Sequence, residues 1–257
     1  MIIAGIDMGI QNTKAVIMKD DKVIGRSVIS TGGADRLAQA QKVYIDALFD
    51  AGVGVDDVEK VAATGTGKFD VQFADEVFTD TVAAARAAKY YYPEATSVMN
   101  VGADGTLAAV LGEDRQIKEV ALNQKCAAGL GTFLTYLARR LGLTMEQAAA
   151  ADGPDAGVMN DGCVVFSELD ALSLINNGAA PAGVMATATR AAATRAATVL
   201  ADLTASPGDK TVLLGGLTSN GAFVNALGKS CDRKFLIPEN AEYGGAVGAA
   251  LCGVKGI

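Results

Sequence analysis

The segment from Asp7 to Lys14 combines residue types that suit phosphate and metal chemistry. An apolar run ends at Asp7, and Gly9, Asn12, Thr13 and Lys14 form a short polar turn before β-type residues resume. Glycine lets the backbone approach a phosphate closely, amide and hydroxyl groups of the turn can donate to its oxygens, and the lysine adds positive charge. A carboxylate such as Asp7 can hold Mg²⁺ through water. The pattern predicts a phosphate-binding turn; an ordinary glycine-containing β-turn with a solvated aspartate is the alternative.

Three more glycine turns follow along the chain. They are Gly102-Ala-Asp104-Gly105, Gly215-Gly216-Leu-Thr-Ser-Asn220 and Gly244-Gly245. Each follows or opens a regular element, as do the turns that hold nucleotides in two-lobed phosphotransferases. The order of these elements along the chain is similar to that in actin, sugar kinases and chaperone ATPases. It consists of two hairpins, then a glycine pair after a late strand, then a glycine pair before a terminal helix. The sequence contains no G-x-x-x-x-G-K-[ST] segment and therefore no P-loop.

Two of the four cysteines stand at turns that precede predicted helices. Cys126 precedes a turn of small residues, and Cys163 follows Gly162. The positive field of a helix N-terminus favours a thiolate or an anionic cluster by about 0.3–1 kcal/mol. Two thiolates are too few for a typical four-iron cluster, but a two-fold dimer would bring two pairs together. The alternative is that both are buried free thiols. For Cys231 and Cys252 we expect core packing.

The composition excludes several classes of function. The 257 residues include no histidine, so one chain cannot form a Ser–His–Asp or Cys–His triad, a histidine metal site or a histidine proton relay. The net charge of −7 argues against nucleic acids and anionic membranes as partners, because both attract lysine and arginine clusters. No run approaches the roughly 18 apolar residues of a membrane span. We therefore expect a cytoplasmic protein with reduced thiols.

The residue patterns predict two successive units of strands and helices that position these turns. For the first unit we expect strands over 1–7, 13–18, 22–30 and 58–64, and helices over 35–51 and 82–92. For the second unit we expect strands over 96–101, 106–111 and 210–214, and helices over 131–141, 145–151, 167–176 and 184–203. The last of these helices has Arg190 and Arg195 as its only charges before Asp202, and its small side chains permit close packing.

The two units echo each other weakly. Ile6-Asp-Met-Gly9 and Met99-Asn-Val-Gly102 are similar, and Asn100 lies 93 positions after Asp7. This spacing predicts a duplicated lobe in an α/β protein. We expect an N-terminal lobe over 1–95, a C-terminal lobe over 96–241, and a terminal helix over 242–257 that closes onto the lobes.

Four longer segments carry a resemblance to a known family. They are Ala63-Thr-Gly-Thr-Gly-Lys68, Lys125-Cys-Ala-Ala-Gly129-Leu-Gly-Thr-Phe133, Cys163-Val-Val-Phe-Ser-Glu168 and Gly244-Gly-Ala-Val-Gly-Ala-Ala-Leu251. With them, the chain resembles the ATPases that activate 2-hydroxyacyl-CoA dehydratases and the related ATPase subunits of benzoyl-CoA reductase. The resemblance implies a two-lobed actin-like (ribonuclease H-like) ATPase fold, with duplicated lobes of mixed β-sheets flanked by helices. It also implies a dimer that holds one 4Fe-4S cluster between its subunits.

The resemblance implies roles for individual residues. Cys126 and Cys163 would ligate the cluster, with two cysteines from each subunit. Asp7 would belong to the first phosphate turn and hold Mg²⁺ through water; we expect Asp7 and, outside the family pattern, Asp104 as catalytic acids. The residues expected to bind ATP or ADP are Gly9, Asn12, Thr13, Lys14 and Gly102 on the phosphate side, and Gly215, Gly216, Asn220 and Gly245 on the adenosine side.

The second phosphate turn departs from the activators of this family. They carry Asp-Ile-Gly-Gly-Gln-Asp where this chain has Asn100-Val-Gly-Ala-Asp-Gly105, so an amide replaces the first acid. Asparagine lacks the negative charge that helps to hold Mg²⁺, and Asp104 falls one place early. The altered turn is more similar to that of a benzoyl-CoA reductase subunit that pairs with a sister ATPase subunit. A second difference is at Asp80, which lies where the activators tend to carry glutamate. A working ATPase and a slowly hydrolysing nucleotide-binding partner both remain open.

From the resemblance we expect an ATP-dependent electron-transfer component. A ferredoxin or flavodoxin would reduce the cluster of a homodimer, or of a heterodimer with a sister ATPase subunit, and ATP between the lobes would alter the surroundings of the cluster. The electron would pass to a catalytic reductase or dehydratase subunit that acts on an acyl-CoA. One alternative is a sugar or small-metabolite kinase, which would share the lobes and phosphate turns. The other is a non-enzymatic actin-like filament protein, which would need no cysteine pair.

Overall fold

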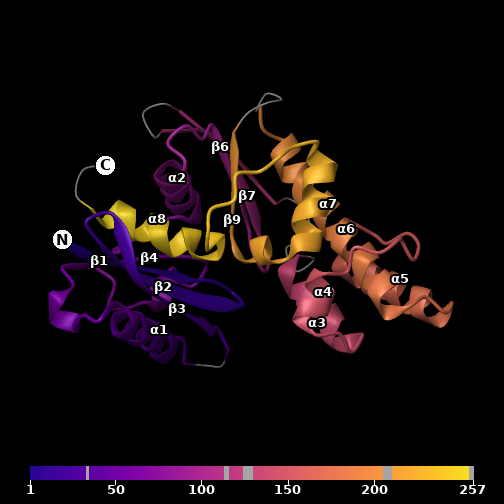
Figure 1. Ribbon diagram of the computed structural model, residues 1–257, viewed down its shortest axis with the longest axis horizontal. Helices are drawn as coiled ribbons and strands as arrows, with labels where there is room; N and C mark the ends of the chain where they lie inside the picture. The colour runs from indigo at the N-terminus through magenta and orange to yellow at the C-terminus, as the bar shows by residue number, and fades with distance from the viewer. Residues whose placement is uncertain (33–34, 113–115, 124–129, 205–209, 255–257) are drawn as a thin grey trace.

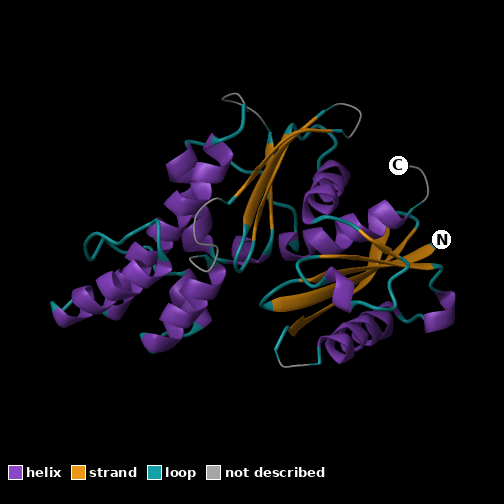
Figure 2. Ribbon diagram, turned by 180° about the vertical axis from the view of Figure 1, so that it is seen from behind, coloured by secondary structure: helices purple, strands orange, loops and turns teal. Residues whose placement is uncertain are grey.

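The computed structural model describes residues 1–32, 35–112, 116–123, 130–204 and 210–254, which form two mixed β-sheets flanked by helices (Figure 1, Figure 2). The first sheet has the strand order β3-β2-β1-β4-β5 and the second has the order β8-β7-β6-β9. The strands are β1 (Ile2–Met8), β2 (Asn12–Lys19), β3 (Lys22–Ser30), β4 (Lys60–Thr64), β5 (Glu76–Val77), β6 (Ser97–Val101), β7 (Thr106–Leu111), β8 (Ile117–Leu122) and β9 (Thr211–Leu214). The helices are α1 (Arg36–Ala51), α2 (Asp80–Tyr91), α3 (Gly131–Arg140), α4 (Met145–Ala149), α5 (Val164–Asn176), α6 (Pro181–Ala201), α7 (Gly221–Cys231) and α8 (Gly244–Gly253).

Both sheets contain the same hairpin. In the first sheet β1 pairs antiparallel with β2, and Asp7 lies opposite Lys14. In the second sheet β6 pairs antiparallel with β7, and Asn100 lies opposite Leu107. The tip of each hairpin is closed by an amide that donates to the carbonyl three residues later, at 3.2 Å in the first turn and 2.8 Å in the second. The same hairpin therefore occurs in both lobes, as the duplication predicted from the sequence requires.

A parallel strand completes the repeated unit in each lobe. β4 runs parallel to β1, and β9 runs parallel to β6. Each of these strands leads into a glycine with positive φ, +90° at Gly65 and +101° at Gly215, a region that favours glycine because it lacks a Cβ. Parallel neighbours end at the same edge of a sheet, so each glycine turn lies beside a hairpin tip.

The two helices between the sheets each pack on the sheet of the other half of the chain. Ala84 of α2 belongs to a buried cluster with Val98 and Leu214 of the second sheet. Ala246 of α8 belongs to a cluster with Ile3 of the first sheet. Both helices are rich in small residues, which lets them pack side by side (Figure 1). The lobe boundaries at 95/96 and 241/242 stay predictions.

Several predicted elements occur with shifted ends. The helix predicted over 82–92 is α2, which begins at Asp80 after the N-cap Thr79. The helix predicted over 167–176 is α5, which begins at Val164, so that Cys163 is its N-cap residue. Strand β8 was not predicted; it mixes lysine and glutamate with aliphatic residues and buries little, so it lacks a clear apolar alternation.

The C-terminal lobe is built around α6. Its buried alanines and threonines pack among α3, α4, α7 and the second sheet. α5 contacts α6 and extends away from the first lobe (Figure 1); its exposed apolar side chains are Val165, Phe166, Leu169 and Leu172. None of the helices in the described residues has the length and apolar character that crossing a membrane requires.

Candidate functional site

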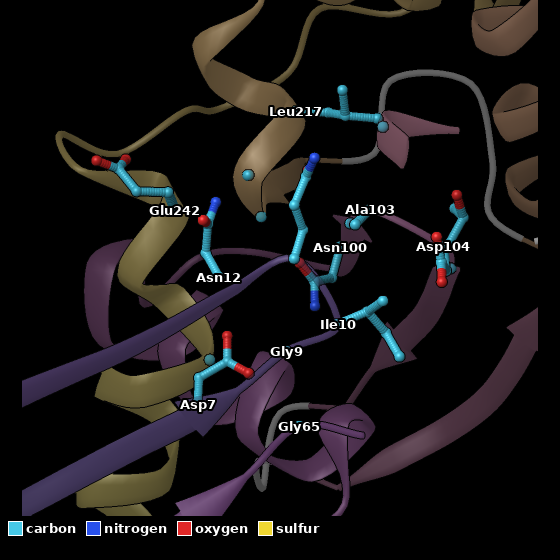
Figure 3. A pocket seen from close by; sticks show the side chains of 18 of the residues that line it. Asp7, Gly9, Ile10, Asn12, Gly65, Asn100, Ala103, Asp104, Leu217 and Glu242 are labelled. Atoms are coloured by element: carbon cyan, nitrogen blue, oxygen red, sulfur yellow. The ribbon is translucent and has the colours of Figure 1, made fainter. Parts of the chain in front are cut away.

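A cleft of about 1280 Å³ lies between the two lobes (Figure 3). Its walls include the two hairpin tips, the glycine turns after β4 and β9, the first turns of α2 and α8, and parts of α3 and α4. Small-molecule pockets typically measure about 300–1,000 Å³. The cleft therefore has room for a nucleotide and its metal ion.

Two glycines enclose the carboxylate of Asp7 in this cleft. A Cβ added at Gly65 would lie 2.6 Å from Asp7 Oδ1, and one added at Gly245 would lie 2.7 Å from Asp7 Oδ2. Cβ atoms do not approach other atoms so closely, so both positions require glycine while Asp7 keeps its place. Lys14 Nζ lies 3.4 Å from Asp7 Oδ2, and both side chains are mostly buried. A positive charge and a carboxylate thus stand together beside the first hairpin tip.

Asp80 contributes a further carboxylate from a different element. It is the first residue of α2 and lines the cleft with its neighbours Thr79 and Thr81. Burial raises the pKa of Asp80, the negative charge of Asp7 raises it further, and Lys68 opposes the shift. Two carboxylates that repel each other are both stabilised by a bound cation.

Asn100 occupies in the second lobe the position that Asp7 has in the first. It lines the cleft (Figure 3), and a Cβ added at Gly215 would overlap its Oδ1. The same enclosure by a positive-φ glycine is found at Asp7. The two lobes therefore present equivalent polar groups to the cleft, one charged and one neutral.

Asp104 and Thr106 lie on either side of Gly105 in the second hairpin. The Asp104 carboxylate accepts a hydrogen bond from Thr132 Oγ1 at the start of α3, which ties the turn to that helix. The Thr106 hydroxyl is buried and lacks a hydrogen-bond partner among the residues that the structure describes. Because an unpaired buried hydroxyl costs free energy and Thr106 lines the cleft, its position fits a ligand oxygen.

The turn after β9 forms another part of the wall. A Cβ added at Gly216 would meet no atom within 4 Å, so the backbone there is open. Asn220 accepts a hydrogen bond from Phe223 N at 2.9 Å and thereby caps α7. Leu217 and Glu242 line the cleft nearby (Figure 3). An open backbone, an apolar side chain and a few polar groups are the features of a small-molecule site.

Most residues predicted for the nucleotide site line this single cleft. They are Asp7, Gly9, Asn12, Lys14, Gly102, Asp104, Gly215, Gly216, Asn220 and Gly245. Thr13 does not line it: the residue is fully buried, and its hydroxyl lies 2.7 Å from Thr31 Oγ1. Asp80, Lys68 and Glu242 line the cleft but were not predicted as site residues. Two sequence signals point to Asp80: it lies where the activators tend to carry glutamate, and it follows Thr79, the N-cap residue of α2.

Cys163 lies in the C-terminal lobe at the start of α5. It is the N-cap residue of this 13-residue helix, and it is half-buried. The amides of Gly162 and Cys163 donate to Asn160 Oδ1 at 2.9 Å and 2.7 Å. The sulfur is thus carried by a turn whose backbone is held by hydrogen bonds.

The other cysteines differ from Cys163. Cys126 lies outside the described residues. Burial raises the pKa of the Cys231 thiol and raises that of Cys252 to about 11, so both resist ionisation. Within the described ranges, no three Cys, Asp or Glu side chains gather closely enough to hold a metal ion.

Comparison with known proteins identifies the family. The BadF/BadG/BcrA/BcrD ATPase family matches residues 4–253. The activator of lactoyl-CoA dehydratase from Anaerotignum propionicum is 30% identical over 98% of this chain and 96% of that protein, and a benzoyl-CoA reductase subunit from Thauera aromatica is 29% identical over 98% and 93%. The solved activator of the 2-hydroxyisocaproyl-CoA dehydratase from Clostridium difficile, with bound ADPNP, has a TM-score of 0.87 at 23% identity, over 98% of this chain and 94% of that one. Both the family resemblance and the predicted two-lobed actin-like ATPase fold are confirmed, and the chain belongs to the BadF/BadG/BcrA/BcrD ATPase family.

Proposed function

We propose that this chain is an ATP-dependent electron-transfer component, in which two subunits share one 4Fe-4S cluster and pass electrons to an acyl-CoA reductase or dehydratase. The observation that carries the proposal is the combination of an acid-and-glycine cleft between the lobes with a cysteine that caps a surface helix. An activator of lactoyl-CoA dehydratase and a subunit of benzoyl-CoA reductase are relatives of the chain. One relative activates an acyl-CoA dehydratase and the other is part of an acyl-CoA reductase, so we propose an enzyme of one of these two classes as the electron acceptor.

ATP binds in the cleft, with its phosphates between the two hairpin tips. Lys14 contributes positive charge to the phosphates, and Asp7 holds Mg²⁺ through water. The buried hydroxyl of Thr106 gains a partner oxygen. The adenosine lies beside Gly216 and Gly245, where the glycine backbone leaves space.

Asp80 activates the water that attacks the terminal phosphate. It lines the cleft, and its raised pKa makes it a stronger base than an exposed aspartate. Asp104, predicted from the sequence as a catalytic acid, also lines the cleft, but its carboxylate is bonded to Thr132. Asn100 adds no charge, so Asp7 is the carboxylate that holds the metal and Asp80 is left as the base.

Cys163 and Cys126 hold the cluster, with two cysteines from each subunit of a homodimer or of a heterodimer with a sister ATPase subunit. When bound, a 4Fe-4S cluster supplies one-electron transfer at low potential. Cys163 fits this group because thiolates are its natural ligands and the positive end of α5 favours an anion by about 0.3–1 kcal/mol. A ferredoxin or flavodoxin is the electron donor.

Packing within the C-terminal lobe connects the nucleotide with Cys163. α7 begins at the cleft, after Asn220, and packs against α6, which contacts α5. ATP bound between the lobes changes the lobe angle, and the surroundings of Cys163 at the subunit interface change with it. Solvent exposure and hydrogen bonding around the sulfur set the reduction potential. Nucleotide binding therefore controls electron transfer.

Anaerobic purification with iron and sulfide analysis tests the cluster, and thermal melting tests the nucleotide site. We expect about four irons per dimer and a higher melting temperature with Mg²⁺ and ATP. Cys163→Ala should lose the iron and keep its response to ATP, while the matched control Cys231→Ala keeps both. A full complement of iron in Cys163→Ala would exclude this ligand, and an unchanged melting temperature would exclude the nucleotide site.

A further inference from the structure

α6 carries two arginines, Arg190 and Arg195, and is otherwise uncharged. Arg195 is 1% exposed and is among the largest fully buried side chains in the described residues. A buried guanidinium costs free energy unless its donors are hydrogen bonded. The hydrogen-bond partners of Arg195 therefore show which segment of the chain it holds in place.

The contacts of Arg195 lead to residues 160–167, which comprise the turn before α5 and the first turn of that helix and are together called the Cys163 turn. Arg195 Nε donates to the carbonyl oxygen of Asp161 at 2.5 Å, and Nη2 lies 3.5 Å from Ser167 Oγ. Ser167 Oγ lies 2.7 Å from the carbonyl oxygen of Asn160 and 2.9 Å from that of Cys163. The guanidinium thus contacts the turn before Cys163 and after it.

Asn160 stabilises the same turn. Its side-chain oxygen accepts hydrogen bonds from the backbone amides of Gly162 and Cys163, and its backbone amide donates to Asp170 Oδ2 at 2.8 Å. These bonds fix the internal shape of the turn, whereas Arg195 fixes the turn against α6.

We infer that Arg195 is a positioning residue for Cys163: it anchors the turn at residues 160–167 to α6 and so determines where the Cys163 sulfur lies. This inference rests on the proposed role of Cys163 as a cluster ligand. Arginine suits the task because its planar guanidinium presents several donors in a fixed fork, whereas lysine carries one ammonium on a flexible stem. Residues that contact a metal ligand orient that ligand and alter the affinity and reduction potential of the bound group.

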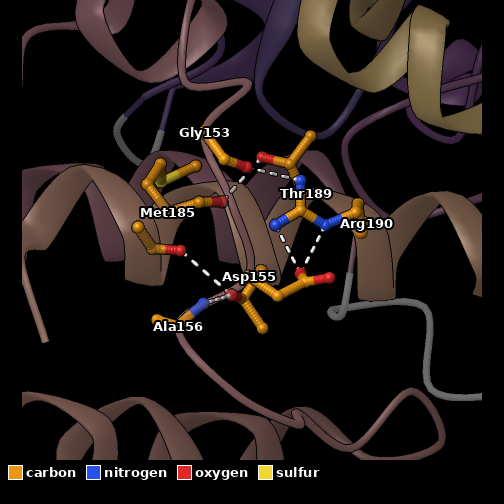
Figure 4. A network of polar contacts seen from close by, with 8 residues as sticks. Gly153, Asp155, Ala156, Met185, Thr189 and Arg190 are labelled. Atoms are coloured by element: carbon orange, nitrogen blue, oxygen red, sulfur yellow. Dashed lines mark hydrogen bonds and ion pairs between the residues drawn. The ribbon is translucent and has the colours of Figure 1, made fainter.

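Arg190 is a matched control on the same helix. Its Nε donates to Asp155 Oδ1 at 2.5 Å, and its Nη1 donates to the carbonyl oxygen of Gly153 at 3.0 Å (Figure 4). These contacts hold residues 153–155, which precede the turn of Cys163. Loss of Arg190, whose side chain is 32% exposed, therefore removes an arginine and its ion pair from the same helix without removing the anchor of the turn.

Hydrogen–deuterium exchange of the full-length protein without iron tests the anchor directly. In Arg195→Met, the amides of residues 160–167 should exchange at least about tenfold faster, the effect of losing hydrogen bonds to a charged donor. Arg195→Lys should recover only part of this protection. In Arg190→Met, residues 160–167 should exchange as in the wild type.

Anaerobic protein provides the second readout. A chelator should remove iron from Arg195→Met at least about tenfold faster than from the wild type or Arg190→Met, and the reduction potential of Arg195→Lys should differ from that of the wild type. Ser167→Ala, a smaller change, should alter exchange and iron loss in the same direction, and it serves as the test if Arg195→Met does not fold.

Wild-type exchange and wild-type iron loss in the Arg195 and Ser167 variants would overturn the inference. A wild-type protein that binds ATP but holds no iron would instead refute the proposed function. In that case faster exchange in Arg195→Met would still support Arg195 as the anchor of the turn, so the two failures are distinguishable.

Discussion

Asp80→Asn is the substitution that tests the chemistry of the cleft most sharply, because it removes one charge and keeps the size of the side chain. Asp80 begins α2 and lines the cleft. Burial and the negative charge of Asp7 raise its pKa, so the fold disfavours its ionised form. The substitution therefore relieves repulsion and removes a base at the same time.

Three quantities should respond to Asp80→Asn in different directions. The kcat for ATP hydrolysis should fall about 10²–10⁴-fold, or about 3–5 kcal/mol of barrier, the usual contribution of a general base. The Kd for ATP should stay unchanged or decrease, because the triphosphate loses a neighbouring negative charge. The melting temperature of the nucleotide-free protein at neutral pH should rise. The pKa of Asp80 is raised in the folded protein, so the free energy of unfolding falls as pH rises through that pKa, and a neutral asparagine avoids this loss.

Phosphate release, calorimetry of ATP binding and thermal melting measure these three quantities. In the wild type, kcat should fall as pH is lowered through the pKa of Asp80, which lies above the ordinary aspartate value of about 3.9. Asp104→Asn is the matched control, with a smaller expected loss because its carboxylate is bonded to Thr132. Hydrolysis by Asp80→Asn within about threefold of the wild-type rate would refute the assignment of the base.

Three further substitutions or treatments have defined outcomes. Gly245→Ala should weaken Mg²⁺–ATP binding at least about tenfold in calorimetry, because its Cβ would lie 2.7 Å from Asp7 Oδ2; wild-type affinity would show that the helix can shift. Asn100→Asp should lower the Mg²⁺ concentration that gives half-maximal hydrolysis, since it adds a carboxylate at the position equivalent to Asp7, and an unchanged value would argue that Asn100 does not face the metal. In iron-free protein treated with iodoacetamide at pH 8, Cys252, with a pKa of about 11, should remain unmodified by mass spectrometry while the half-buried Cys163 reacts; rapid modification of Cys252 would contradict its burial.

The duplicated hairpins could be predicted because each leaves a local signature. Asp7 and Asn100 follow apolar runs and precede glycine, and the structure gives the two hairpins the same register. The packing of α2 and α8 on the opposite sheets could not be predicted. Small residues cover these helices, so their sequences carry no strong apolar stripe that would select one sheet.

The cleft was predictable at its turns and less so elsewhere. Thr13 was expected in the phosphate turn, but side chains alternate along β2, so Asn12 and Lys14 reach the cleft while Thr13 is buried. No glycine neighbours Asp80 in the sequence, and only the fold brings it near Asp7 and Gly65. The burial of a charged residue such as Arg195 is likewise a tertiary property, because its partners come from a turn about 30 positions earlier.

An anaerobic redox titration followed by electron paramagnetic resonance, with and without Mg²⁺ and ATP, tests the proposed function most directly. We predict an iron–sulfur signal that is absent from Cys163→Ala and present in Cys231→Ala, with a reduction potential that shifts when ATP is added. A protein that shows no such signal, or a potential that ATP leaves unchanged, would contradict an ATP-controlled electron carrier.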